Sequence, residues 1–378
     1  MQYRKLCGEE VSILGFGTMR FPVIDKNYKK IDKQKAEEML DHAIEKGVNY
    51  LDTAKPYHRG ESEKFVGRYL KKQNLRDKIF LATKLPAWLI KEEADFDKQF
   101  NDQLEKLQTD YFDFYLLHAL NTKSWQNIKD LGVLKWCEKK KAEGKIKHIG
   151  FSFHDSYSVF KEIVDAYDKW EFCQLQYNYM DLEFQAGEKG FKYALENNIE
   201  IIVMEPLRGG QLSKVPPLEI EKLWQKFPVK RSYADGALQW VWNKKQVPIL
   251  LSGMTTMQHV KENIESAKTA KIGIYSKKEL ALFKAIRTAY LKRSPFFCTT
   301  CKYCQPCPHG VDISSVLGFY MMNVMYDDLK RSKMFYSFLA EENRADKCVE
   351  CGECEPKCPQ QIEIIKWLKE SHKILKKD

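Results

Sequence analysis

No apolar run in this 378-residue sequence approaches the length of a membrane span, which takes about 20 residues. The first residues, MQYRKLCGEEVSILGFG, also lack an extended apolar core after their charges, so they do not resemble a secretory signal. We therefore expect a cytoplasmic protein that has no membrane span.

Motifs for nucleic-acid binding are lacking as well, although the formal net charge is +10. The lysines are interspersed with acids, as in K-W-C-E-K-K-K-A-E-G-K, which is typical of a solvated helix face. We therefore expect no nucleic-acid partner, and at most a weak attraction of an acidic electron-carrier protein.

Cysteine occurs eleven times, but its spacing is not that of a disulfide framework. Eight cysteines fall in two runs, C-T-T-C-K-Y-C-Q-P-C-P and C-V-E-C-G-E-C-E-P-K-C-P. Each run has three thiols at i, i+3 and i+6 and a fourth before proline, as in bacterial two-cluster ferredoxins, where the fourth cysteine binds the other cluster. The runs predict two [4Fe–4S] clusters, one held by Cys298, Cys301, Cys304 and Cys358, the other by Cys348, Cys351, Cys354 and Cys307.

Two details of the cysteine runs leave alternatives open. The first run has two residues, not three, before Cys307, so the cluster that Cys307 serves is less certain. Structural zinc sites also use paired C-x-x-C, but they need four ligands in two pairs, so two runs of four favour iron and sulfur. Iron–sulfur ligation indicates a reducing, anaerobic setting, and Cys7, Cys137 and Cys173 are interpreted as packing residues.

Short apolar runs alternate with amphipathic helical patterns up to about residue 285, which indicates strand–helix units and a parallel sheet. The first strand is expected over residues 14–19, after a hairpin turning at residues 8–10, and the first helix over residues 33–46. Seven further strands follow, so the pattern predicts a (β/α)8 barrel, the TIM-barrel fold.

The domain organisation follows from these patterns. We expect the barrel over residues 1–288 and a small, mainly helical ferredoxin-like domain over residues 289–378. The segments D-I-S-S-V-L-G-F-Y-M-M-N-V-M-Y and R-S-K-M-F-Y-S-F-L-A are apolar at helical spacing, and a basic helix is expected over residues 366–376.

Three ionisable side chains end neighbouring strands of the predicted barrel. Asp52, Lys84 and His118 close the second, third and fourth strands. Consecutive parallel strands lie side by side, so these groups should meet at the C-terminal face, where such barrels carry their active sites. A lone buried histidine is usually structural, but three such groups at one rim indicate a functional site.

Tyr57 follows Asp52 by five residues and completes a possible proton-donor site. A phenol has a pKa of about 10, and a neighbouring ammonium lowers that pKa. Lys84 can supply the ammonium, Asp52 can hold it in place, and His118 can hydrogen-bond a substrate oxygen. Such a site suits hydride transfer to a carbonyl carbon, which needs a proton at the developing oxyanion.

These residues resemble those of the aldo-keto reductase superfamily. The similarity lies in D-T-A-x-x-Y with G-E-S-E behind it, in the lysine ending I-F-L-A-T-K and in the histidine ending Y-L-L-H. The resemblance, which extends from about residue 3 to residue 267, implies a tetrad of Asp52, Tyr57, Lys84 and His118, with Tyr57 as general acid. The cysteine-rich tail resembles that of the branch with a C-terminal two-cluster ferredoxin domain.

The resemblance also implies a nicotinamide site, with departures from the family pattern. Phe153 replaces an asparagine, Met204 stands where an aromatic ring is usual, and Gly253 and His259 stand where cations often surround the 2′-phosphate of NADP. A strong preference for NADP is therefore not expected; NAD(H), NADP(H) or a flavin remain open. The expected cofactor-binding residues are Ser152, Gln176, Met204, Gly209, Gly253, Met254, His259, Glu262 and Asn263.

Nicotinamide transfers two electrons as hydride, whereas an iron–sulfur cluster transfers one at a time. The first hypothesis is an oxidoreductase that reduces a carbonyl or related organic substrate while its clusters exchange electrons with a ferredoxin, another redox protein or a cofactor. The alternatives are a plain NAD(P)H-dependent carbonyl reductase with a structural or docking iron–sulfur domain, and a redox-sensing regulatory subunit.

Overall fold

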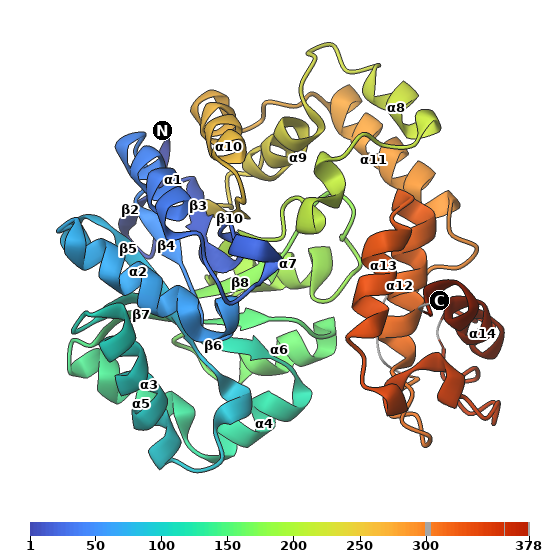
Figure 1. Ribbon diagram of the computed structural model, residues 1–378, viewed down its shortest axis with the longest axis horizontal. Helices are drawn as coiled ribbons and strands as arrows, with labels where there is room; N and C mark the ends of the chain where they lie inside the picture. The colour runs from blue at the N-terminus through green and yellow to red at the C-terminus, as the bar shows by residue number, and fades with distance from the viewer. Residues whose placement is uncertain (299–303, 359, 377–378) are drawn as a thin grey trace. The chain divides into compact units, whose positions relative to one another are not determined.

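The computed structural model describes residues 1–298, 304–358 and 360–376, which form two compact units (Figure 1). The first unit comprises Met1–Leu182, Ala186–Ser213 and Arg231–Ile274, and the second Glu183–Gln185, Lys214–Lys230 and Tyr275–Asp378. The domain boundary at residue 288 stays a prediction. Within the described ranges, every helix is too short or too polar to cross a membrane.

The first unit is built on a closed barrel of eight parallel strands, which confirms the predicted (β/α)8 fold. Neighbouring strands follow one another along the chain, and the last strand pairs with the first. The strands are β3 (Leu14–Gly17), β4 (Tyr50–Asp52), β5 (Phe80–Leu85), β6 (Phe112–Leu120), β7 (Ile146–Phe153), β8 (Phe172–Gln176), β9 (Glu200–Met204) and β10 (Ile249–Gly253).

Helices connect these strands (Figure 1). They are α1 (Lys33–Glu45), α2 (Glu61–Lys72), α3 (Ala94–Leu107), α4 (Thr122–Asp130), α5 (Val133–Ala142), α6 (Tyr157–Asp165), α7 (Gly187–Glu196), α9 (Tyr233–Trp242) and α10 (Met257–Thr269). Helix α1 shows why they form: the Asp32 carboxylate accepts from the backbone N–H of Lys35, which caps the first turn. Its apolar residues at three- and four-residue spacing are buried on one face.

Two predicted boundaries are corrected at the start of the chain. Strand β3 ends at Gly17, not at residue 19, because Thr18 begins the 3-10 helix η1 (Thr18–Arg20) and donates its hydroxyl to the carbonyl oxygen of Asp52 at 3.0 Å. The hairpin of β1 (Tyr3–Leu6) and β2 (Glu9–Ser12) turns at Cys7 and Gly8. These two residues have φ of +51° and +85°, as a two-residue hairpin loop requires.

Alternate residues of each barrel strand face the interior, because side chains of a strand point to opposite faces in turn. Tyr50, Ala82 and Phe114 belong to a buried apolar cluster that also includes Leu6 and Val11 of the hairpin. The predicted polar residues lie further along the same strands. Asp52 and Lys84 each lie two residues beyond the apolar residue of their strand, and His118 lies four residues beyond Phe114. The same alternation that builds the apolar core therefore positions Asp52, Lys84 and His118 above it.

The second unit is helical in the part of the chain that the structure describes, which confirms a mainly helical ferredoxin-like domain. Its helices are α8 (Leu218–Trp224), α11 (Lys277–Lys292), α12 (Ile313–Tyr326), α13 (Leu329–Ser337) and α14 (Ile364–Leu375). Its apolar core includes Val316, Leu317, Ile364 and Leu368. Six of the predicted cluster ligands pack against this core: Cys298, Cys304, Cys307, Cys348, Cys354 and Cys358.

Gly150 on β7 provides a test of barrel packing. A Cβ atom there would lie 2.5 Å from the carbonyl oxygen of Phe172 and 2.7 Å from its ring, so Gly150→Ala should lower the free energy of unfolding by about 1–3 kcal/mol. At Gly17 the nearest atom would be 3.4 Å away and φ is −81°. Gly17→Ala should therefore cost less than about 1 kcal/mol, and denaturant unfolding followed by tryptophan fluorescence checks both; equal costs would contradict the packing argument.

Candidate active site

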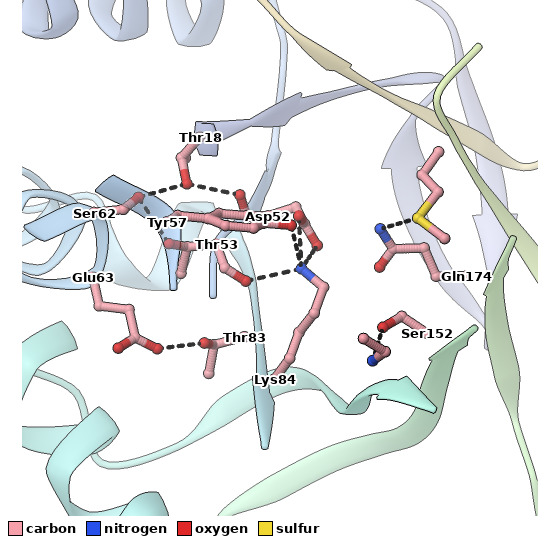
Figure 2. A network of polar contacts seen from close by, with 12 residues as sticks. Thr18, Asp52, Thr53, Tyr57, Ser62, Glu63, Thr83, Lys84, Ser152 and Gln174 are labelled. Atoms are coloured by element: carbon pink, nitrogen blue, oxygen red, sulfur yellow. Dashed lines mark hydrogen bonds and ion pairs between the residues drawn. The ribbon is translucent and has the colours of Figure 1, made fainter. Parts of the chain in front are cut away.

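A buried ion pair lies at the C-terminal face of the barrel (Figure 2). The Lys84 ammonium is 2.8 and 2.7 Å from the two carboxylate oxygens of Asp52 and donates to the carbonyl oxygen of Thr53 at 2.9 Å. Burial raises the pKa of Asp52 and lowers the pKa of Lys84, while each partner's charge opposes that effect. Either group buried alone would lose a large hydration free energy, so the two charges depend on each other for their burial.

The structure brings Tyr57 and His118 to the same pair. Tyr57 begins the 3-10 helix η3 (Tyr57–Gly60), and its hydroxyl lies 3.5 Å from the Lys84 ammonium. The rings of Tyr57 and His118 meet edge to face, with centroids 6.3 Å apart. All four residues predicted to form a tetrad are therefore neighbours.

The prediction that Lys84 lowers the pKa of Tyr57 is wrong in this structure. Burial and then the Asp52 carboxylate raise the pKa of Tyr57 well above its ordinary value of 10. The physical reason is that the phenol is buried, and the charges of Asp52, Tyr28 and Glu205 add to the effect of burial while Arg20 opposes it. Tyr57 therefore keeps its proton and can donate it.

His118 is held in its neutral form. Burial, followed by the charge of Lys84, lowers the pKa of His118 well below its ordinary value of 6.5. Its Nδ1 atom is buried and has no hydrogen-bond partner within the described residues. A neutral imidazole carries one donor and one acceptor, so the ring can hydrogen-bond a neutral oxygen group.

The first turn of α2 supports this site from outside the barrel (Figure 2). The Ser62 hydroxyl lies 2.8 Å from that of Thr18 and 3.0 Å from that of Thr53. Since Thr18 also bonds the Asp52 carbonyl oxygen, these hydroxyls fix the backbone that carries Asp52.

The next residue, Glu63, supports the strand that carries Lys84. Its Oε1 accepts from the Thr83 hydroxyl at 2.8 Å and from the Gln103 amide at 2.7 Å, and that amide also donates to the Lys84 carbonyl oxygen at 2.9 Å. Burial raises the pKa of Glu63, and these hydrogen bonds oppose the rise. The G-E-S-E segment is thus a support for two neighbouring strands.

A cavity of about 600 Å³ opens beside the tetrad. Asp52, Tyr57 and His118 line it. Seven of the residues expected to bind a cofactor line the same cavity: Met204, Gly209, Gly253, Met254, His259, Glu262 and Asn263. The cavity therefore joins the tetrad to most of the expected cofactor site.

The two remaining expected residues, Ser152 and Gln176, are not among those that line the cavity. The Ser152 hydroxyl accepts from the backbone N–H of Ala119 at 2.8 Å, and the Gln176 amide donates to Asp181 at 2.8 Å.

Gln174 lines the cavity, although the sequence interpretation missed it. Its Nε2 lies 3.6 Å from the Met204 sulfur, and its Oε1 is buried with no partner among the described residues. Gln174 on β8 lies directly beside Ser152 on β7 in the parallel register. Aligning the two predicted strands residue by residue would therefore have pointed to Gln174.

One cation and one anion lie close together in the wall of the cavity, after strands β3 and β9. Arg20 and Glu205 both line it, with 3.6 Å between the guanidinium and the carboxylate. Glu205, Arg208, Gly209 and Gly210 all have positive φ, so the chain after β9 follows a tight turn along the cavity. Arg20 is the one lysine or arginine among the lining residues.

A second, smaller cavity gathers predicted cluster ligands. Cys307, Cys348, Cys351 and Cys354 all line it, and so does Cys304. Cys307 therefore lies with the second run, as does Cys304, and several thiols around one space are the ligands that an iron–sulfur cluster takes. No three histidine, cysteine or acidic side chains of residues 1–298, 304–358 and 360–376 are grouped to hold a single metal ion.

The other predicted cluster site is described only in part. Cys301 lies outside the described residues, whereas Cys298, Cys304 and Cys358 are half-buried. The backbone N–H of Cys298 lies 3.2 Å from the Met321 sulfur.

The fold and its two groups of side chains define a barrel oxidoreductase with an attached iron–sulfur domain. The chain belongs to the aldo/keto reductase family, whose model matches residues 13–286. Residues 297–363 match the model of a 4Fe-4S dicluster domain.

Known proteins of the same family resemble this chain over much of its length. The uncharacterized oxidoreductase YqkF of Bacillus subtilis is 26% identical over 72% of this chain and 93% of its own length. The aldo-keto reductase yakc [NADP(+)] of Schizosaccharomyces pombe is 29% identical over 56% of this chain and 62% of its own length. A solved aldo-keto reductase from Bacillus halodurans, in its holo form, matches with a TM-score of 0.62 and 27% identity, over 76% of this chain and 96% of its own.

The buried ion pair predicts non-additive stability changes. Asp52→Leu or Lys84→Met should each lower the free energy of unfolding by about 3–5 kcal/mol, because each leaves a charge buried alone. The double variant should cost less than the sum of the two. Denaturant unfolding measures all three.

The exposed pair of Lys72 and Glu37, with 2.7 Å between nitrogen and oxygen, is the control. Lys72→Met should cost less than about 1 kcal/mol. Fully additive losses at residues 52 and 84 would contradict the coupling.

Proposed function

We propose that this oxidoreductase reduces a carbonyl or related organic substrate, with Tyr57 as the proton donor and two [4Fe–4S] clusters exchanging electrons with a redox partner. The observation that carries the first part is the position of the Tyr57 hydroxyl, 3.5 Å from an ammonium that is itself bonded to Asp52. A protonated phenol at the cavity wall, beside a neutral imidazole, is suited to hold and protonate a carbonyl oxygen.

Each residue of the tetrad has a separate task. His118 orients the carbonyl oxygen through a ring nitrogen, and Tyr57 donates its hydroxyl proton to that oxygen as negative charge develops. Lys84 stabilises the phenolate that remains, and Asp52 keeps Lys84 in place. A nicotinamide, when bound, supplies the hydride to the carbonyl carbon.

The cavity is suited to NADP(H) or NAD(H), held by Gln174, the turn at Gly209 and the start of α10. The unpartnered Oε1 of Gln174 supports it as the acceptor for the carboxamide N–H. The relative from Schizosaccharomyces pombe is named for NADP(+), which supports NADP(H). Arg20, already paired with Glu205, is one possible contact for a 2′-phosphate, so we expect modest discrimination between the two. A flavin stays a prediction.

The dicluster domain supports a role in electron transfer. Iron–sulfur clusters, when bound by the two cysteine sets, supply one-electron steps. Two one-electron centres carry as many electrons as one hydride, and a two-electron cofactor at the barrel, nicotinamide or flavin, would take up both electrons together with a proton before hydride passes to the substrate. A plain reductase with a structural iron–sulfur domain is the alternative, which predicts no change in cluster oxidation state on adding reduced nicotinamide or substrate.

Tyr57→Phe tests the proposed acid. Loss of the hydroxyl should lower kcat for carbonyl reduction by about 10²–10⁴-fold, because the oxyanion loses its proton source. Cofactor affinity and iron content should not change. Tyr111→Phe, whose hydroxyl lies 3.5 Å from the Asp77 carboxylate, is the control and should keep full activity. Activity of Tyr57→Phe equal to that of the control would exclude Tyr57 as the donor.

Two neighbouring glutamines test the cofactor site. Gln174→Ala should weaken binding of NADPH by about 3- to 10-fold, the effect of losing one hydrogen bond. Gln176→Ala should leave the affinity unchanged, because its amide is bonded to Asp181. Fluorescence titration with NADPH and with NADH measures both, and the reverse order would assign the site to Gln176.

A further inference from the structure

Electrons exchanged with a partner pass through the surface of the cluster domain, and an exposed ligand, Cys351, belongs to the predicted cluster site whose four cysteines are all described. We propose that the cavity formed by Cys307, Cys348, Cys351 and Cys354 is the electron port of this protein, and that a one-electron carrier protein docks on the uncharged surface around Val349. This inference rests on the proposed electron exchange and names the cluster and the surface that serve it.

The first observation is the exposure of a cluster ligand. Among the predicted ligands that the structure describes, Cys351 is exposed and the others are half-buried. Val349, which lines the same cavity, has 58% of its surface exposed. Pro306 and Pro308 line the cavity as well and are exposed. A docked carrier would therefore meet a cluster ligand directly, with apolar side chains around it.

The second observation concerns the described part of the other ligand set, in which the three described cysteines are half-buried. Cys298 is half-buried, and its backbone N–H is bonded to the Met321 sulfur. Close to it in sequence, Phe296 stacks with Tyr320 at a centroid distance of 5.7 Å and contacts Trp367 at 5.1 Å. Electron transfer slows steeply with distance, so an exposed ligand such as Cys351 favours its own site as the port.

The third observation is that charges around the port are paired. Lys347 lies 3.4 Å from Asp346, and Lys357 lies 3.9 Å from Glu353. Further along, Lys369 bonds Glu350 at 2.8 Å. These pairs leave little net charge next to the cluster, in contrast to the formal charge of the whole chain.

The chemistry of the partner follows from this surface. An apolar centre with a polar rim is the usual anatomy of an interface, and weak redox complexes bury small areas. The matching carrier has its redox centre in an uncharged, apolar face.

The test uses the full chain with both clusters reconstituted without oxygen and oxidised. A reduced bacterial two-cluster ferredoxin is mixed with it in a stopped-flow spectrometer, and the second-order rate constant of cluster reduction is measured. Val349→Glu and Val349→Lys should both lower this constant by tenfold or more, because either charge disrupts an apolar contact. Reduction by dithionite, the iron content and the EPR spectrum should not change.

Phe338 supplies the matched controls, because it lies in the same unit and is 73% exposed. Phe338→Glu and Phe338→Lys should react with the ferredoxin as the wild type does. Rates unchanged at residue 349, equal losses at residues 338 and 349, or opposite effects of Glu and Lys at residue 349 would overturn the port. Reduction of the wild type by dithionite but by neither ferredoxin nor flavodoxin would also overturn it.

The same stopped-flow experiment distinguishes a failure of the proposed function from a failure of the proposed electron port. Clusters that accept electrons from the carrier at a rate sensitive to residue 349, but never change oxidation state with NADPH or with any carbonyl substrate, would leave the port in place. That result would remove the proposed link between the clusters and the barrel.

Discussion

The contact between Lys84 and Asp52 is the interaction on which the rest of the site depends. Both groups are almost completely buried, and removing two charges from water costs several kcal/mol for each. Short hydrogen bonds offset that cost only if the strands that carry the two residues are fixed. The hydroxyls of Thr18, Ser62 and Thr53, and the amide of Gln103, provide that fixing. The pair also adds to the effect of burial on its neighbours, since burial and then Asp52 raise the pKa of Tyr57, and burial and then Lys84 lower the pKa of His118.

The sequence predicted the barrel and the tetrad because both follow from simple periodicities. Alternation along β4, β5 and β6 puts Asp52, Lys84 and His118 on the inner face, and parallel strands that are consecutive in sequence are also neighbours in space. The spacing of the cysteines left open which cluster Cys307 serves, and in the structure Cys307 lines one cavity with Cys348, Cys351 and Cys354. Local pattern and tertiary arrangement agree at these positions.

Other features depend on properties that a linear pattern does not contain. The sequence alone did not show that Gln174, rather than Gln176, lines the cavity, because that depends on the pairing of β7 with β8. The raised pKa of Tyr57 comes from burial and from charges that include Asp52 and Glu205, so it depends on the positions of groups that are far apart in the sequence. The early end of β3 depends on a hydrogen bond between Thr18 and a strand more than thirty residues away.

The apolar core of the second unit has thiols along its edge, in contact with residues such as Val316 and Leu368. A core arranged in this way is completed by inorganic atoms as well as by hydrocarbon, and ligands held by metal contribute to the folding of small domains. Scarcity of iron or damage by peroxide would therefore loosen this region and make it a substrate for proteases. The lifetime of the tail in a cell then becomes a measure of that cell's nutritional and oxidative state.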